Sequence, residues 1–347
     1  MRPPDTEYAL APDGVKIAYQ VTGAGSIDLV LMQGAVAHLE LQWEDRVFRR
    51  LFERLSSFSR LIRFDRRGMG MSSVLDRLPT FDEQVEDFAG VMDAVGSERA
   101  AVMGTIDAGT LALAFAAAHS ERTQAVVAFE ASPRFTRSDE DDFGVDPDVM
   151  SRFAQAAQTF DVDATMAIVA PGRINEPGFR SWFRRYTRAG QSGIQAQAVV
   201  MMLMTLDVVD QLSSIAPPVL VLHKSAHPML PIRSARALAA ALPNAQLVEL
   251  PGSGTAIFSN DVEEVADEIE TFLTGVRPPP RRDRILATVL FTDIVGSTAR
   301  AAEMGDQEWR SLLEHHHRLL RASLERFGGR EIHTAGDGFL ATFDSPL

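Results

Sequence analysis

The sequence lacks cysteine, and this absence excludes several kinds of chemistry at once. No disulfide, thiol nucleophile or cysteine-ligated zinc site can form in this chain of 347 residues. Long apolar runs are absent too. The longest, Ala198–Leu206, ends at Asp207, well short of the roughly 18 residues that a membrane helix needs. The N-terminal residues contain no apolar segment of a signal peptide. These absences predict a cytoplasmic protein with no membrane span.

Positive charge is scarce. The chain has 34 lysines and arginines against 47 aspartates and glutamates, a formal net charge of −13 at pH 7. Nonspecific binding to nucleic acid needs basic surface that displaces counterions, so the acidic composition argues against nucleic-acid partners. The hydrophobic fraction of 46% is typical of a globular protein, and the length favours two domains.

A proline-rich segment divides the chain. Residues 276–284 read VRPPPRRDR, and neither a helix interior nor a paired strand accommodates three consecutive prolines. We therefore predict a first domain over residues 1–275, a linker over residues 276–284, and a second domain over residues 285–347.

The first domain alternates apolar runs of strand length with amphipathic stretches. This alternation predicts a mostly parallel sheet covered by helices on both faces. Between about residues 135 and 215 helix-like stretches such as Asp146–Phe160 dominate, which predicts a helical cap over one end of the sheet. The predicted strands are Val15–Val21, Ile27–Met32, Leu61–Phe64, Ala100–Met103, Gln124–Phe129, Pro218–His223 and Gln246–Leu250.

Three motifs in this domain occur in a characteristic order. Gln33 and Gly34 follow a strand, the turn Phe64–Ser72 reads FDRRGMGMS, and Met103–Gly109 reads MGTIDAG at a strand-to-helix turn. The second motif matches D-x-R-G-x-G-x-S, and the third lies where a nucleophile elbow is expected. Over roughly residues 8–273 the chain resembles the α/β-hydrolase family, which implies the α/β-hydrolase fold.

The resemblance places the catalytic positions of that family on residues unsuited to hydrolysis. Ile106 occupies the nucleophile position and has no lone pair with which to attack a carbonyl. His227 stands where the carboxylate is expected, and Thr255 stands where the histidine base is expected. We predict a catalytically degenerate domain that acts as a regulatory module or binds a small apolar ligand.

A shift of the elbow by one residue gives a second hypothesis. Asp107 then becomes the nucleophile and Gly109 the second glycine, as in hydrolases that use an aspartate. Such an enzyme needs a histidine base, whereas His119 and His223 fall on a helix and a buried strand, where we expect structural roles. An esterase or Asp-nucleophile hydrolase with a vestigial second domain therefore stays open. A non-enzymatic ligand-binding scaffold is the third hypothesis.

The second domain carries two acidic motifs. Val289–Thr298 reads VLFTDIVGST and Thr334–Phe339 reads TAGDGF, with a predicted helix at Trp309–Phe327 between them. This order and spacing resemble the class III adenylyl and guanylyl cyclases. The resemblance implies an α+β, ferredoxin-like domain that forms 3′,5′-cyclic AMP or cyclic GMP from ATP or GTP. It also implies a homodimer, because the family builds its active sites between two subunits.

The same resemblance assigns residues to the cyclase site. Asp293 and Asp337 are expected to bind two Mg²⁺ or Mn²⁺ ions with the help of the Ile294 carbonyl, since hard cations prefer oxygen ligands. His333 stands at the base-selecting position, where adenylyl cyclases have a lysine, so the choice between ATP and GTP stays open. The residues expected to contact the triphosphate at a helix N-terminus are Gly296, Ser297 and Thr298.

Two further features bear on the second domain. His315, His316 and His317 are not expected to form a metal site, because consecutive helix positions point about 100° apart. The chain stops at Leu347, before the remaining strands and helices that the cyclase resemblance implies. We expect either a fragment of a longer protein or a remnant of the cyclase domain.

Overall fold

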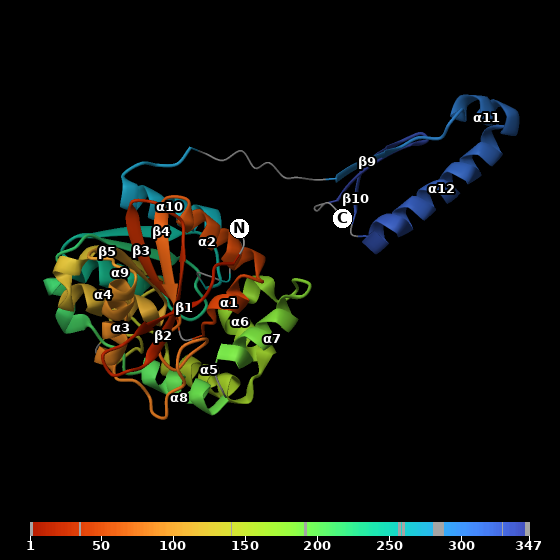
Figure 1. Cartoon of the computed structure of the whole chain (residues 1–347). Helices are drawn as coiled ribbons and strands as arrows, with labels where there is room; N and C mark the ends of the chain where they lie inside the picture. The colour runs from red at the N-terminus through yellow and green to blue at the C-terminus, as the bar shows by residue number, and fades with distance from the viewer. Residues whose placement is uncertain are drawn as a thin grey trace. The chain divides into compact units, whose positions relative to one another are not determined.

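The chain forms two compact units, residues 1–278 and residues 279–347, in a computed structural model (Figure 1). Part of the predicted linker, residues 280–284, and residues 285–287 and 344–347 of the predicted cyclase segment lie outside the described residues. The structure describes residues 3–34, 36–139, 141–190, 193–255, 258, 261–279, 288–327 and 329–343, without the side chains of 193–195 and 325–326.

The first unit is built on an eight-stranded sheet with the strand order β1-β2-β4-β3-β5-β6-β7-β8. The β1–β2 and β2–β4 pairs are antiparallel, and every later pair is parallel, which confirms the predicted mostly parallel sheet. The strand β1 was not predicted, because only one of its four residues is buried. The strands are β1 (Glu7–Leu10), β2 (Lys16–Thr22), β3 (Ile27–Met32), β4 (Ser59–Phe64), β5 (Ala100–Thr105), β6 (Thr123–Phe129), β7 (Val219–Lys224) and β8 (Ala245–Leu250).

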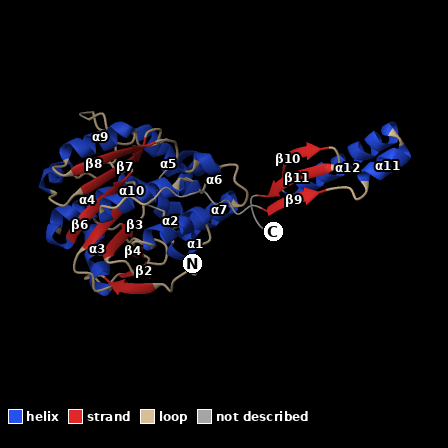
Figure 2. Cartoon of the chain, turned by 90° about the horizontal axis from the view of Figure 1, so that it is seen from above, coloured by secondary structure: helices blue, strands red, loops and turns tan. Residues whose placement is uncertain are grey.

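Helices cover both faces of this sheet. Figure 2 shows α3, α4 and α9 on one side and α2 and α10 on the other. Local sequence explains where they begin. The Asp45 side chain caps α2, and Thr80 and Glu83 form a reciprocal capping box at the start of α3. The helices are α1 (Leu39–Gln42), α2 (Arg46–Ser56), α3 (Phe81–Ala94), α4 (Asp107–Ala118), α9 (Ile232–Ala241) and α10 (Val262–Thr274), with a 3₁₀ turn η1 (Ser120–Arg122).

Residues between β6 and β7 form a helical segment, and none of the described strands falls within it. Aromatic contacts attach it to the sheet domain: the ring of Tyr186 stacks on Trp182, and both rings lie near Phe48 of α2. The Tyr186 hydroxyl also donates to the carbonyl of Val36 at 2.7 Å. The elements are α5 (Pro147–Thr159), α6 (Val162–Val169), η2 (Pro171–Arg173), α7 (Phe179–Gly190), α8 (Gly193–Leu203) and η3 (Val209–Ser214).

The second unit is a three-stranded antiparallel sheet, ordered β10-β11-β9, with two helices. Its small core joins Leu324 of the long helix to Phe339 and Ala341 of the central strand. This α+β arrangement fits part of a cyclase domain. Among the helices that the structure describes in either unit, none is long and apolar enough to cross a bilayer. The elements are β9 (Thr288–Thr292), α11 (Ser297–Met304), α12 (Asp306–Phe327), β10 (Arg330–Ala335) and β11 (Gly338–Phe343).

Candidate functional site

The turn from β5 to α4 holds Ile106 in a strained backbone conformation. Ile106 has φ 58° and ψ −117°, which a β-branched residue rarely adopts. Small neighbours make the sharp turn possible. A side chain at Gly104 would collide with the Ala108 carbonyl, and one at Gly109 would collide with Ala131. The backbone of a nucleophile elbow is therefore present, and Ile106 occupies its tip.

Asp107 is the first residue of α4, and its carboxylate is buried. Nη1 of Arg66, from the turn after β4, donates to the Asp107 carboxylate. The same guanidinium donates through Nη2 to Gln84 of α3. Because Arg66 and Asp107 are both at most 2% exposed, they form a buried ion pair in which each compensates the charge of the other.

The oxyanion side of the elbow is partly occupied by the protein's own groups. The backbone N–H of Gly34 donates to the Thr105 hydroxyl at 3.2 Å, so this donor is satisfied internally. A Cβ atom at Gly34 would lie 2.7 Å from Oδ1 of Asp107, which places a carboxylate oxygen directly beside Gly34. A negative oxygen at this place opposes the charge that develops on a carbonyl oxygen during acyl transfer.

His227, at the position expected for the acid, is buried and paired with Glu130. Its Nδ1 accepts the backbone N–H groups of Met229 and Leu230 at 3.1 and 2.9 Å. Its Nε2 lies 3.2 Å from Oε2 of Glu130. Burial lowers the pKa of the neighbouring His223, whose ring lies 5.6 Å from that of His227.

Thr255, at the position expected for the histidine base, is fully buried. Its hydroxyl donates to the carbonyl of Val169 in the helical segment at 2.6 Å, and its N–H lies 3.3 Å from the same oxygen. Thr255 thus links the loop after β8 to α6, and its hydroxyl proton is already engaged.

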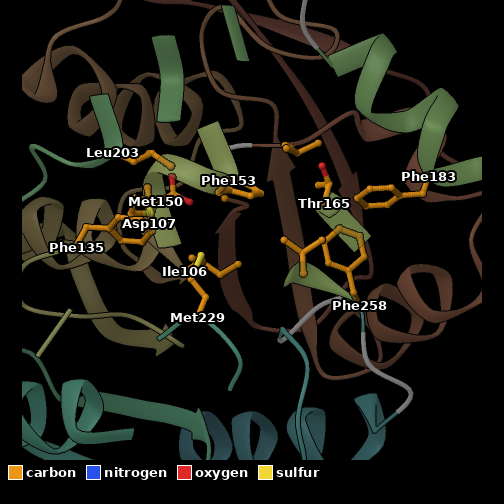
Figure 3. A pocket seen from close by; sticks show the side chains of 13 residues that line it. Ile106, Asp107, Phe135, Met150, Phe153, Thr165, Phe183, Leu203, Met229 and Phe258 are labelled. Carbon is orange, nitrogen blue, oxygen red and sulfur yellow. The ribbon is translucent and has the colours of Figure 1, made fainter. Parts of the chain in front are cut away.

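An apolar cavity lies above the elbow, between the sheet and the helical segment. In Figure 3, Asp107, Phe135 and Met150 lie toward one side of it, and Thr165 and Phe183 toward the other. Asp107 is the only charged residue among the described lining residues. They are Gly34, Val36, Ile106, Asp107, Phe135, Met150, Phe153, Thr165, Val169, Phe183, Leu203, Met229 and Phe258.

In the second unit, strand pairing brings the two predicted metal-binding aspartates together. Thr292 of β9 pairs with Phe339 of β11, so Asp293 leaves the sheet beside the β10–β11 turn that contains Asp337. The Asp337 carboxylate accepts the Ile294 N–H at 3.3 Å. A hydrogen bond from the Ser297 side chain lowers the pKa of Asp337.

The residues next to these aspartates begin α11. Gly296 is its N-cap and adopts a left-handed conformation, with φ 69°, and Ser297 and Thr298 form the first turn. The Ile294 carbonyl accepts the Ser297 N–H at 3.2 Å. Among the described residues no group of three or more metal-binding side chains is present. Asp293 and Asp337 carry carboxylate oxygens, which are the hard donors that Mg²⁺ and Mn²⁺ prefer.

His333 and Asp293 line the same hollow on the surface of the second unit. A register shift in β10 between Glu331 and His333 places His333 opposite Leu340, which itself pairs with Phe291. These cross-strand partners line a shallow surface hollow together with Asp293. The structure thus brings His333, the predicted base-selecting residue, and Asp293, a predicted metal-binding residue, to one surface. The rings of His316 and His317 lie 5.9 Å apart on α12, outside this hollow.

Comparisons with known proteins agree with this division of the chain. Residues 29–268 match the alpha/beta hydrolase family. The chain belongs to this family. Residues 281–346 match the adenylate and guanylate cyclase catalytic domain. The chain is thus a fusion of an alpha/beta hydrolase domain with a cyclase segment.

Relatives and solved structures resemble the hydrolase domain. The pimeloyl-[acyl-carrier protein] methyl ester esterase of Nitrosomonas europaea is 27% identical over 72% of this chain and 96% of its own length. The corresponding esterase of Aliivibrio fischeri is 26% identical over 74% of this chain and 96% of its own length. An enol-lactonase from Burkholderia xenovorans (TM-score 0.64, 22% identity, 77% of this chain and 100% of that one) shares the fold. An esterase from Exiguobacterium antarcticum also shares the fold, with a TM-score of 0.68 and 19% identity over 78% of this chain and 100% of that one.

Sequence reasoning missed three residues of the hydrolase domain that the tertiary structure brings to the site. Arg66 was part of a recognised motif, but nothing local showed that it pairs with Asp107. Glu130 follows β6 with φ 55° and is fully buried, and an acidic residue directly after an apolar strand was the signal available for it. Thr165 lies on α6 and gave no signal in the sequence.

Proposed function

We propose that this chain belongs to a cytoplasmic cyclic-nucleotide signalling protein. Its cyclase domain forms 3′,5′-cyclic AMP or cyclic GMP, and its hydrolase-family domain binds a ligand without hydrolysing it and regulates the cyclase. The observation that carries the first part is the meeting of Asp293 and Asp337 at one edge of the β9–β11 pair. The matching family model supports the nucleotide substrate.

Each residue of the cyclase site has a proposed task. The ribose 3′-oxygen bonds to the α-phosphorus, the bond from that phosphorus to the bridging oxygen breaks, and pyrophosphate leaves. Asp293 and Asp337, with the Ile294 carbonyl, would hold two Mg²⁺ or Mn²⁺ ions. When bound, these ions acidify the hydroxyl group and neutralise the leaving charge. His333 would face the base. Gly296, Ser297 and Thr298 would bind the triphosphate from the start of α11.

The decisive assay is manganese-dependent cyclic-nucleotide formation from ATP and from GTP, by the natural protein at its full length and as a homodimer. We expect product from at least one nucleotide, and its loss in Asp293→Ala. Glu331→Gln is the matched control, because Glu331 pairs with Arg321 on the exposed surface of the same unit. A folded dimer that forms no product from either nucleotide would refute cyclase activity.

The proposed non-hydrolytic role rests on the residues at the elbow. Ile106 occupies the tip, Asp107 is held by Arg66, and Thr255 is bonded to Val169. None of these groups is placed to deliver a nucleophile and a base to a carbonyl. The apolar cavity above them remains, and it is suited to bind a small apolar molecule.

Ester hydrolysis is the competing function, favoured by the esterase activity for which the two relatives above are named. It would use Asp107 as the nucleophile. Release of 4-nitrophenol from 4-nitrophenyl butyrate, abolished by Asp107→Asn, would establish it and displace the regulatory role. We expect no release above the rate with heat-denatured protein.

A further inference from the structure

Tyr186 of α7 joins the helical segment to a wall of the apolar cavity. Its side chain is fully buried. The hydroxyl donates to the carbonyl of Val36 at 2.7 Å, and it accepts a hydrogen bond from Nε2 of Gln42 at 2.9 Å. Val36 lines the cavity, as does Phe183, which precedes Tyr186 by about one turn on α7 (Figure 3). One hydroxyl group thus connects two parts of the cavity wall that come from distant segments of the chain.

A buried arginine fixes the direction of these two hydrogen bonds. Nη1 of Arg63 donates to Oε1 of Gln42 at 2.9 Å. Because a guanidinium group can only donate, the amide of Gln42 turns its oxygen toward Arg63 and its NH₂ group toward Tyr186. The Tyr186 hydroxyl therefore accepts from Gln42, and its single proton is left for the Val36 carbonyl.

The same amide group also holds the residue that precedes the cavity wall. Nε2 of Gln42 donates to Oε1 of Gln33 at 2.6 Å, and Gln33 directly precedes the cavity residue Gly34. Gln33 and Val36 are therefore both bonded to one buried network, to which the helical segment contributes Tyr186. The loss of one member of such a network leaves its buried partners without a hydrogen bond.

Ring contacts hold Tyr186 independently of its hydroxyl group. The ring stacks on Trp182 at 4.8 Å and lies 6.1 Å from Phe48 of α2. Nε1 of Trp182 also donates to the carbonyl of Leu41 at 3.0 Å. These contacts remain when the hydroxyl is removed, so α7 stays packed while the bond to Val36 is lost. The hydrogen bond to the wall is thus separable from the packing of α7.

We propose that the Tyr186 hydroxyl is a latch that keeps the cavity closed, because it holds the wall at Val36 against α7. When this hydrogen bond breaks, the wall separates from α7 and solvent reaches the cavity. The inference rests on the proposed function, in that such an opening admits and releases the bound ligand. It concerns access to the cavity and requires no particular ligand chemistry.

Oxidation of buried methionines by hydrogen peroxide, followed by mass spectrometry on the full chain, measures this access. Peroxide converts the thioether to a sulfoxide and is itself reduced to water. Met150 lines the cavity, Met92 lies on α3, and both are fully buried. We expect Met150 in Tyr186→Phe to be oxidised at least five-fold faster than in the wild type, with Met92 unchanged. Tyr19→Phe is the matched control, because it removes a hydroxyl group that bonds to Glu7 at the β1–β2 edge of the sheet.

Gln42→Glu separates the latch from a loss of stability. The new carboxylate keeps an acceptor for Arg63, now with the opposite charge, and it offers Tyr186 an acceptor in place of a donor. The single hydroxyl proton then bonds to the carboxylate, and Val36 loses it. We expect Met150 to be oxidised as fast as in Tyr186→Phe, in a protein that urea denaturation shows to be at least as stable as Tyr186→Phe.

The outcomes for the latch and for the cyclase are separable. Unchanged oxidation of Met150 in either variant would overturn the latch. Equal acceleration at Met92 would also overturn it, since that result reports global unfolding and not a local opening. A protein that forms no cyclic nucleotide but shows the local opening would refute the cyclase proposal and leave the latch intact.

Discussion

The Oδ2 atom of Asp337 accepts a hydrogen bond from the backbone N–H of Ile294 at 3.3 Å. This contact joins the β10–β11 turn to the residue that follows Asp293. The carboxylate therefore has a part in the local fold of the cyclase segment in addition to its proposed role in binding metal. A substitution at this position must separate the two roles.

Asp337→Asn makes that separation, because an asparagine keeps a side-chain oxygen for the Ile294 N–H but loses the negative charge. We expect cyclic-nucleotide formation to fall by about 100-fold or more, the size of effect seen when charge stabilisation is removed from an active site. The circular-dichroism spectrum should be unchanged. Full activity of Asp337→Asn at saturating Mn²⁺ would contradict the proposed metal role.

The strained backbone of Ile106 predicts that a glycine at this position gives a more stable protein than an alanine. Ile106→Gly removes both the side chain and the strain of a left-handed β-branched residue, whereas Ile106→Ala loses packing but keeps a Cβ atom at φ 58°. We expect the glycine variant to be more stable than the alanine variant by about 1 kcal/mol. Urea denaturation measures both. At ordinary positions a glycine variant is less stable than an alanine variant. If Ile106→Gly were also the less stable variant here, the turn would be unstrained.

The buried ion pair of Arg66 and Asp107 predicts that substitutions at the two positions have non-additive effects on the free energy of unfolding. Asp107→Asn leaves an uncompensated buried guanidinium and should lower the free energy of unfolding by about 3 kcal/mol. Arg66→Met in the same background should recover most of that loss, because no buried charge is then left unpaired. Additive effects in the double-mutant cycle would argue that the two side chains do not interact.

The buried carboxyl group of Asp65 predicts that the free energy of unfolding falls as the pH rises. Burial raises the pKa of the Asp65 carboxyl from its ordinary 3.8 to about 6. Between these values the folded state binds more protons than the unfolded state, so the contribution of Asp65 to stability falls as the pH rises from 4 to 6. Relative to Asp65→Asn, which does not titrate, the wild type should lose about 3 kcal/mol of unfolding free energy across this window. If the difference in unfolding free energy between the wild type and Asp65→Asn stayed constant from pH 4 to 7, the raised pKa of Asp65 would be contradicted.

The sequence alone was sufficient to assign both families and the type of the main sheet. Those features depend on local information: the apolar runs that became β3 and β5, the glycines around Ile106, and the aspartates that follow or connect strands. Residue types by themselves also limit the chemistry, because an isoleucine is no nucleophile and a threonine is no base near neutral pH. Local patterns missed β1, because only one of its four residues is buried and no apolar run marks it in the sequence.

Only the tertiary structure decided which groups meet. Arg66 and Asp107 are 41 residues apart, and the Gly34 N–H and the Thr105 hydroxyl are 71 apart. His227 pairs with Glu130 only because β6 and β7 are neighbours in the sheet. Periodicity and motifs describe one segment at a time, whereas a buried charge is stable only with a partner that the fold supplies. The residues of the elbow could therefore be identified from the sequence, whereas the pairing of Asp107 with Arg66 beside them was decided by the packing of the fold.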